Sequence, residues 1–171
     1  MATTFDADLD FSRSLEPAQD RILRCVFGDT SKIIRYGPDF EFRLDKRYHI
    51  DLAVDTGYGT YTLQSKSLRN YTKKYGNNLT VEYMSNIAED IEGEFFHLFA
   101  HLFFSGRANE DETDYETWHI IRCIDFVSWI RKKIKNQEFL PIREVKNGNA
   151  SFLYYPFDSL PREMIYASSD D

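Results

Sequence analysis

The chain has only two cysteines, Cys25 and Cys123, among its 171 residues. Two thiols so far apart give no disulfide framework, so we expect a cytoplasmic protein with both thiols buried. The N-terminus has no basic segment followed by an apolar one, and we therefore expect no secretory signal. The longest apolar run, residues 95–104, is too short to span a bilayer, so no membrane partner is expected.

An excess of basic residues is also absent, because the formal net charge is −7. This charge argues against a protein that binds a polyanion with its whole surface, but it leaves room for a local basic strip. The length and a hydrophobic content of 42% are enough for one domain with a substantial core. We expect a disordered acidic N-terminus over residues 1–13 and a single domain over residues 14–171.

The pattern of apolar residues predicts an α/β protein with a central mixed β-sheet flanked by helices and a C-terminal β-hairpin extension. A first helix is expected over residues 14–27, capped by Ser14 and ended by Gly28. Further helices are expected over residues 85–106 and over residues 125–136, the latter capped by Asp125. Strands are expected over residues 31–37, 40–55, 60–68, 79–84 and 117–124, with a terminal hairpin over residues 141–157.

The segment HIDLAVDTGYGTYTLQSKS, which starts at His49, reads as a β-hairpin that carries an acid, an amide and an ammonium group. A turn centred between Gly57 and Tyr58 creates two opposed pairs, Asp51 with Gln64 and His49 with Lys66. Because strand residues alternate between faces, the opposite side is apolar and should face the core. Its members are Ile50, Leu52 and Val54.

These polar groups are the ones that metal-assisted phosphodiester hydrolysis needs. Asp51 and Gln64, with the Ser65 carbonyl, offer the oxygen ligands that a hard divalent cation prefers. Lys66 would position or activate an attacking water, or stabilise charge that builds on a phosphate. The alternative interpretation is an ordinary surface ion pair of little energetic consequence.

The spacing Asp51-x12-Gln64-x-Lys66 resembles the PD-(D/E)xK nuclease superfamily, in the variant with Gln before x-Lys. Holliday-junction resolvases, Mrr-like restriction enzymes and a small class of homing endonucleases look similar, with a helix before such a hairpin and a helix and a strand after it. The resemblance covers residues 14–105. It implies a restriction-endonuclease-like core and a site-specific, Mg²⁺- or Mn²⁺-dependent DNA endonuclease that acts as a homodimer without an organic cofactor. The alternatives are a structure-specific nuclease and a catalytically silent nucleic-acid-binding module.

The resemblance also implies an acid on the first helix that binds metal or water. Asp20 is the best match, and Glu16, one turn earlier, is the alternative. The literal PD dipeptide is Pro38-Asp39, which makes Asp39 an alternative metal acid outside the hairpin. Glu82 is a possible further ligand from the next strand.

Residues 56–81 contain no acid but carry several cations interleaved with tyrosines. Cations would neutralise phosphates and tyrosines would stack on bases, so we expect a nucleic-acid-binding segment, with a solvated loop as the alternative. The residues expected to bind are Arg69, Tyr71, Lys73, Lys74 and Tyr75. A second basic group, formed by Arg131, Lys132, Lys133 and Lys135, is better explained as the solvated C-terminus of a helix.

Glu94, His97 and His101 have a spacing that would place them on one face of the expected helix at residues 85–106. The surrounding phenylalanines and leucines instead favour core histidines with satisfied hydrogen bonds. His119 is interpreted as structural.

Overall fold

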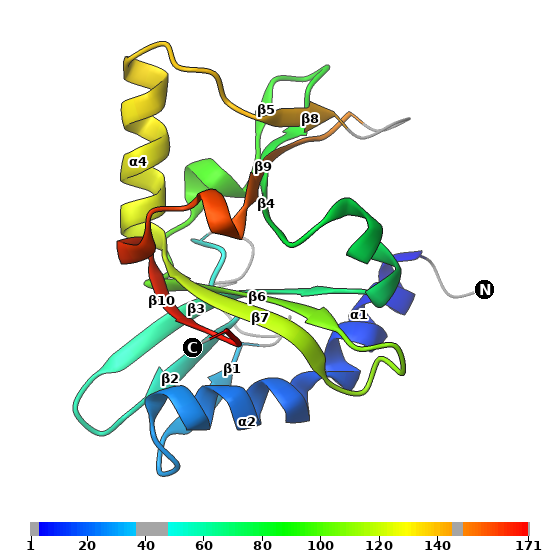
Figure 1. The fold of residues 1–171 in the computed structure, drawn as a ribbon, viewed down its shortest axis with the longest axis vertical. Coiled ribbons are helices and arrows are strands. Elements are labelled where there is room, and N and C mark those ends of the chain that lie inside the picture. The colour runs from blue at the N-terminus through cyan, green and yellow to red at the C-terminus, as the bar shows by residue number, and fades with distance from the viewer. Residues whose placement is uncertain (1–3, 37–47, 145–148, 171) are drawn as a thin grey trace.

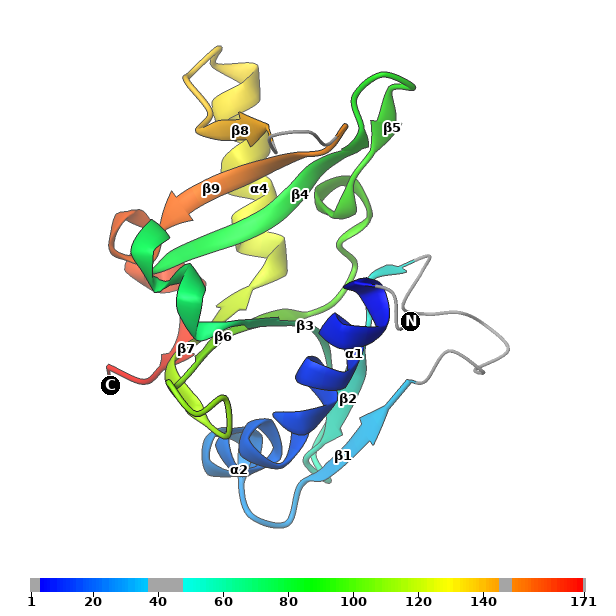
Figure 2. The same ribbon diagram turned by 90° about the vertical axis from the view of Figure 1, so that its right-hand side faces the viewer.

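The structure, a computed structural model, describes residues 4–36, 48–144 and 149–170. Within these ranges the strands form two sheets, which we name sheet A and sheet B. Figure 1 shows sheet B above sheet A, with helix α2 below sheet A and helix α4 beside sheet B. Figure 2 shows the same two sheets turned, with α4 behind sheet B. The α/β class and the mixed sheet are confirmed.

Sheet A is mixed, because β3 and β6 are parallel and every other neighbouring pair is antiparallel. Its order among the described strands is β1 (Lys32–Arg35), β2 (Leu52–Asp55), β3 (Thr60–Leu68), β6 (Leu102–Ala108), β7 (Tyr115–Arg122) and β10 (Ile165–Ser168). The predicted strands at residues 31–37, 60–68 and 117–124 are thus confirmed, whereas β10 was not predicted.

Sheet B is antiparallel and is reached from β3 through the 3₁₀ helix η1 (Asn70–Tyr75). Its described order is β5 (Ile91–Glu92), β4 (Asn78–Asn86), β9 (Ser151–Pro156) and β8 (Ile142–Glu144). The pairing of β8 with β9 confirms the C-terminal hairpin. This hairpin does not extend a single sheet, however, because it pairs with β4 to build the second one.

From residue 4 on, the N-terminal segment for which disorder was expected is described as a helix. Helix α1 (Thr4–Ser14) precedes helix α2 (Glu16–Phe27), and Phe11 and Leu15 are buried against Ala108. This apolar contact holds α1 against β6. Ser14 does not cap α2, since its hydroxyl donates to the Phe11 carbonyl at 2.7 Å.

Helix α4 (Cys123–Lys135) matches the helix predicted over residues 125–136, and the 3₁₀ helices η3 (Phe157–Ser159) and η4 (Arg162–Met164) follow β9. Asp125 lies in the first turn of α4 and is not its cap, because Arg122 precedes the helix there. Cys123 is buried and Cys25 is exposed, so the prediction of two buried thiols is wrong for Cys25. Within the described residues, no helix has both the length and the hydropathy to cross a membrane.

The helix predicted over residues 85–106 is wrong. This segment forms β5, the short 3₁₀ helix η2 (Glu94–His97) and β6. Every residue of β6 is buried, with Phe103 facing one core cluster and Phe104 the other. A strand covered on both faces reads as a continuous apolar run, which periodicity alone does not distinguish from a buried helix.

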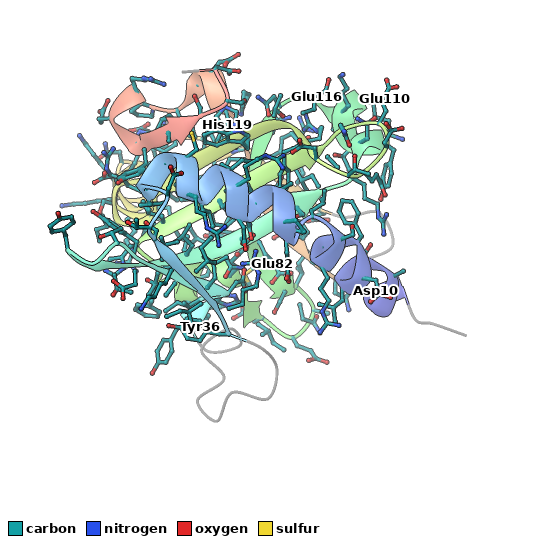
Figure 3. All side chains as sticks on the ribbon, turned by 90° about the horizontal axis from the view of Figure 1, so that it is seen from below. Asp10, Tyr36, Glu82, Glu110, Glu116 and His119 are labelled. Carbon is teal, nitrogen blue, oxygen red and sulfur yellow. The ribbon has the colours of Figure 1, made fainter. Side chains whose placement is uncertain are left out.

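Two core clusters lie on the two faces of sheet A. On the lower face, Ile22 and Leu23 of α2 pack against Leu63, and Figure 3 shows α1 and α2 lying across this face. The upper cluster joins Phe103 to α4 and sheet B. Since Gln64 pairs with Phe103, its side chain lies on the upper face, opposite to that of Leu63.

Candidate functional site

The β2–β3 hairpin has the register that its turn predicts. Leu52 pairs with Leu63 and Asp55 with Thr60, and Leu52 and Leu63 share the lower cluster as expected. The turn is closed by Thr56 N–H, which donates to the Gly59 carbonyl at 3.0 Å. Gly57 has a φ of 80°, a conformation that glycine adopts without a steric penalty.

The register shifts at Asp51. Its N–H donates to the Leu63 carbonyl at 2.9 Å, although Leu52 is the residue paired with Leu63. Two residues of one strand therefore oppose one residue of the other, which defines a β-bulge. Asp51 is thus displaced by one residue from the predicted position opposite Gln64.

The bulge also overturns two predictions for the residues before it. Ile50 packs against the upper cluster, so it does not share the face of Leu52. His49 has a φ of 49° and its ring stacks near that of His97, with 6.4 Å between centroids. His49 therefore leaves the strand and does not pair with Lys66.

The Asp51 carboxylate nevertheless reaches the Gln-x-Lys motif. Its Oδ2 accepts a hydrogen bond of 2.6 Å from the backbone N–H of Ser65. Bonds of this kind to an ionised acceptor are about twice as strong as neutral ones. Because the N–H and C=O of a strand residue point to the same edge, the Ser65 carbonyl is directed to the Asp51 side as well. Asp51 and the backbone of Ser65 therefore meet at the end of the ladder.

Gln64 presents an unusual buried acceptor. Its Oε1 is buried and has no hydrogen-bond partner among the described residues. An unsatisfied buried polar atom destabilises a protein by about 1–3 kcal/mol, and each instance in a native fold calls for an explanation. Gln64 adjoins Ser65, so this acceptor lies next to the residue that holds Asp51.

Lys66 lies on the same face as Gln64, two residues further along β3. Its Nζ donates to the Thr80 carbonyl of β4 at 3.2 Å and lies 5.1 Å from the centre of the Phe152 ring. The ammonium group therefore bridges sheet A to sheet B. Glu82 pairs with Phe152 across β4 and β9, which places Glu82 on the same face of sheet B as that ring.

The two candidate acids of the first helix do not join this group. Arg35 of β1 binds the Glu16 carboxylate at 3.1 Å and the Asp20 carboxylate at 2.6 Å. Helix α2 covers the lower face of sheet A, so both acids lie across the sheet from the side chains of Gln64 and Lys66. A hollow of about 570 Å³ beside these acids is lined by Arg13, Glu16, Pro17, Asp20, Arg21, Arg24 and Asp29.

The α2 residue that does reach the motif is Gln19, which the sequence reading missed. Gln19 is buried, donates to the Ser65 hydroxyl at 2.5 Å and accepts from Arg35 at 3.1 Å. The signal for it was its spacing of three and four residues from Ile22 and Leu23, which puts a polar side chain on the apolar face of the helix. The neighbouring Ser67 hydroxyl bonds the Tyr115 hydroxyl at 2.7 Å, and burial raises the pKa of Tyr115 to about 12.

The other candidate ligands are dispersed. Asp39 lies outside the described residues. Glu94 accepts from the Glu82 N–H at 3.4 Å, His97 lies 3.4 Å from Glu92, and His101 Nδ1 bonds the Thr62 hydroxyl at 2.9 Å. His97 and His101 are both exposed, so the expectation of core histidines is wrong for each of them. In the part of the chain that the structure describes, no three His, Cys, Asp or Glu side chains are grouped to hold a metal.

The basic segment after β3 is only partly available to a ligand. Arg69 binds Asp8 at 3.4 Å and Glu112 at 2.9 Å, and Lys73 binds Glu116. Lys74 instead lies 5.0 Å from the centre of the Tyr75 ring, and Tyr75 is 56% exposed. Tyr71 is also exposed. Arg69 and Lys73 are therefore neutralised, whereas Lys74 and the two tyrosines face solvent.

No protein-family model, curated protein or solved structure matches this chain. The arrangement at the hairpin must therefore be judged on its chemistry. It combines one anchored carboxylate, a buried amide oxygen to which no described residue donates, a backbone carbonyl and a nearby ammonium group. Such a set can bind a hard cation and an anionic substrate together.

Proposed function

We propose that the protein is a Mg²⁺-dependent DNA endonuclease whose reaction centre consists of Asp51, Gln64, Ser65 and Lys66. The observation that carries this proposal is the buried Gln64 Oε1 without a partner, one residue from the Ser65 N–H that holds Asp51. A cation would give this oxygen the partner that it lacks among the described residues. Cation binding, and not the stability of the fold, would then explain why this oxygen is buried at a cost in free energy.

The donor set suits a Mg²⁺ ion that the protein alone would bind weakly. Carboxylate, amide and carbonyl oxygens are its preferred ligands, and Mg²⁺ commonly uses one or two carboxylates together with waters and substrate phosphates. Asp51 supplies the only carboxylate of the proposed centre, so the substrate phosphate would complete the site. When bound, the ion would neutralise charge on the phosphate and lower the pKa of a water. Mn²⁺ would fit the same ligands.

Each residue has a separate task in this proposal. The bond from Ser65 N–H keeps the Asp51 carboxylate aimed at the end of the β2–β3 ladder. Lys66 is held between the Thr80 carbonyl and the Phe152 ring, and it would orient the attacking water or stabilise charge on the phosphate. Asp20 and Glu16, bound to Arg35, have no part in the reaction centre.

The topology of sheet A adds support for a restriction-endonuclease-like core. Helix α2 precedes an antiparallel β1–β2–β3 series, and β3 then lies parallel to β6. The hairpin is followed by sheet B and short 3₁₀ helices in place of a long helix, which departs from the pattern of that superfamily. Cutting both strands of DNA needs two such centres, so a homodimer is part of the proposal.

A catalytically silent nucleic-acid-binding module is the second candidate. It is favoured by Gln64, which stands where an acid would add a second carboxylate, and by Lys66, whose ammonium already has an acceptor in Thr80. Both proposals predict binding of nucleic acid. Only the endonuclease predicts cleavage that requires a divalent cation.

Substitutions of Asp51 test the endonuclease directly. Asp51→Asn keeps an oxygen that can accept from Ser65 N–H, so the free energy of unfolding should change by less than about 1 kcal/mol. It removes the charge that binds the cation, so cleavage of plasmid DNA with Mg²⁺ or Mn²⁺ should be lost. Lys66→Ala should reduce the cleavage rate at least about 100-fold. Absence of cleavage by the parent protein, or its survival in both variants, would refute the mechanism.

A further inference from the structure

One face of sheet B is covered and the other is open. Leu79, Val81 and Leu153 pack in the same cluster as α4, and Figure 1 shows α4 beside that face. Because strand residues alternate, the residues between them on β4 and β9 face the other side. They include Thr80, Glu82, Phe152 and Tyr154, all only partly buried.

A continuous series of cations and aromatic rings runs over this open face. Lys66 lies over Phe152, which pairs with Arg143 across β8 and β9. The Arg143 guanidinium lies 4.2 Å from the centre of the Tyr154 ring. The Tyr154 hydroxyl donates to the Tyr75 carbonyl at 2.8 Å, and Lys74 lies over the Tyr75 ring. We call this set the cation–ring strip: Lys66, Phe152, Arg143, Tyr154, Tyr75 and Lys74.

The charges of the strip are available. Within the described residues, Lys66, Lys74 and Arg143 form no ion pair with a carboxylate, whereas Arg69 and Lys73 outside the strip do. Three unpaired cations on one face are notable in a chain of net charge −7. Glu82 is the acid that the register places on this face. The strip therefore offers positive charge beside π-faces, and among the described residues of β4 Glu82 adds a negative charge to this face.

We propose that the cation–ring strip binds a single nucleic-acid strand and leads it to Lys66. Cations that follow a backbone and rings on which unpaired bases stack are the two elements of single-strand binding surfaces. A duplex would not use the rings in this way, because its bases are already stacked on each other. The inference rests on the proposed function only at the Lys66 end, where the phosphate to be cut would lie. Each centre of the proposed homodimer would then take one strand of a locally unpaired duplex.

The test measures binding in EDTA, where no cleavage occurs. The probe is a fluorescein-labelled 20-nucleotide single strand of mixed sequence, compared with the matching duplex by fluorescence anisotropy. Arg143→Ala and Tyr154→Leu should each weaken binding of the single strand about tenfold, since the loss of one stacked base or one phosphate contact has this size. Tyr154→Phe keeps the ring and should bind within about twofold of the parent.

The matched control is the double variant Arg131→Ala with Lys132→Ala, which removes two exposed cations from α4. It should leave binding within about twofold of the parent, and thermal melting should show every variant to be folded. The proposal is overturned if the control weakens binding as much as Arg143→Ala does. It is also overturned if the duplex binds more tightly than the single strand and is insensitive to Tyr154→Leu.

The two proposals fail separately. If the parent cleaves DNA and the strip variants bind normally, the strip is refuted and the endonuclease stands. If the strip variants lose binding while the parent never cleaves, the strip is supported and the endonuclease is refuted.

Discussion

At the scale of the residue, the buried Gln19 and the half-buried Gln64 have opposite hydrogen-bond states. Gln19 uses both ends of its amide, donating to Ser65 and accepting from Arg35. Gln64 has a buried Oε1 that accepts nothing among the described residues. The first arrangement stabilises the fold, because it links α2 to β1 and β3. The second lowers stability, and the proposed cation site accounts for its presence.

This contrast predicts opposite effects for the same substitution. Gln64→Leu removes an unsatisfied oxygen, so it should raise the free energy of unfolding by about 1 kcal/mol and the melting temperature by about 2–4 °C. Gln19→Leu leaves Ser65 and Arg35 each short of a partner and should lower stability by about 1–3 kcal/mol. Thermal and urea unfolding without divalent metal would measure both. If Gln64→Leu destabilised the protein as much as Gln19→Leu does, the Oε1 of Gln64 would have a hydrogen-bond partner in solution. A cation would then not be needed to explain its burial.

The sequence predicted the residues of the hairpin better than their partners. The pairing of Leu52 with Leu63 follows from the turn and from the alternation of side chains, which are local. The bonds of Gln19 depend on where α2 lies over the sheet, and no local pattern predicted either these bonds or the bulge at Asp51. Asp20 and Glu16 were expected at the site for their chemistry, yet Arg35, from a strand further along the chain, binds both.

At the scale of the element, the segment between β4 and β6 depends on a close approach at Gly93. A Cβ at this position would lie 2.8 Å from the backbone carbonyl oxygen of Glu82. Gly93 N–H also donates to the Tyr83 carbonyl at 2.9 Å, so the segment runs close beside β4 there. The position of Glu82 on the open face of sheet B is thereby linked to η2.

Gly93→Ala should therefore lower the free energy of unfolding by about 1–3 kcal/mol, because backbone must move to admit the methyl group. Gly59 is the matched control, since a Cβ there meets nothing within 4 Å. Gly59→Ala should change stability by less than about 0.5 kcal/mol, or raise it slightly by restricting the unfolded chain. Urea unfolding of both variants is the measurement. If the two variants changed the free energy of unfolding equally, the backbone at Glu82 would move to admit the methyl group without a cost in free energy.

Two of the elements that the sequence predicted correctly, β4 and α4, have one face packed against the core. From Leu79 to Glu82, β4 alternates between buried and half-buried residues, and α4 has a helical spacing of Phe126 and Ile130. Strand β6 is covered on both faces, so its residues show no alternation and resemble a helix in sequence. The error at residues 85–106 thus follows from the position of β6 at the centre of the molecule.

At the scale of the whole molecule, pairings between distant segments decide the architecture. The parallel pair of β3 and β6 and the pairing of β4 with β9 join segments separated by tens of residues along the chain. Hydrophobic patterning gives each strand but not its neighbour, so one sheet was expected where there are two. The second sheet matters for the proposed binding of nucleic acid, because its open face carries most of the cation–ring strip.

The net charge of the whole molecule sets how binding responds to salt. A chain of net charge −7 repels nucleic acid except at local positive groups, and the strip has three cations, Lys66, Lys74 and Arg143. Each phosphate neutralised on a single strand contributes a slope of about −0.7 to log K against log salt, so three contacts predict about −2. Anisotropy titrations between about 50 and 200 mM KCl span the range in which this slope is read.

Repulsion between the negatively charged protein and nucleic acid can only make this slope shallower, because salt screens repulsion as well as attraction. Arg143→Ala should reduce the magnitude of the slope by about 0.7, whereas Tyr154→Leu should weaken binding and leave the slope unchanged, since stacking releases no counterions. A slope steeper than about −5 would indicate a broad basic surface and would contradict the local strip. A slope near zero would mean that the cations of the strip do not contact phosphate.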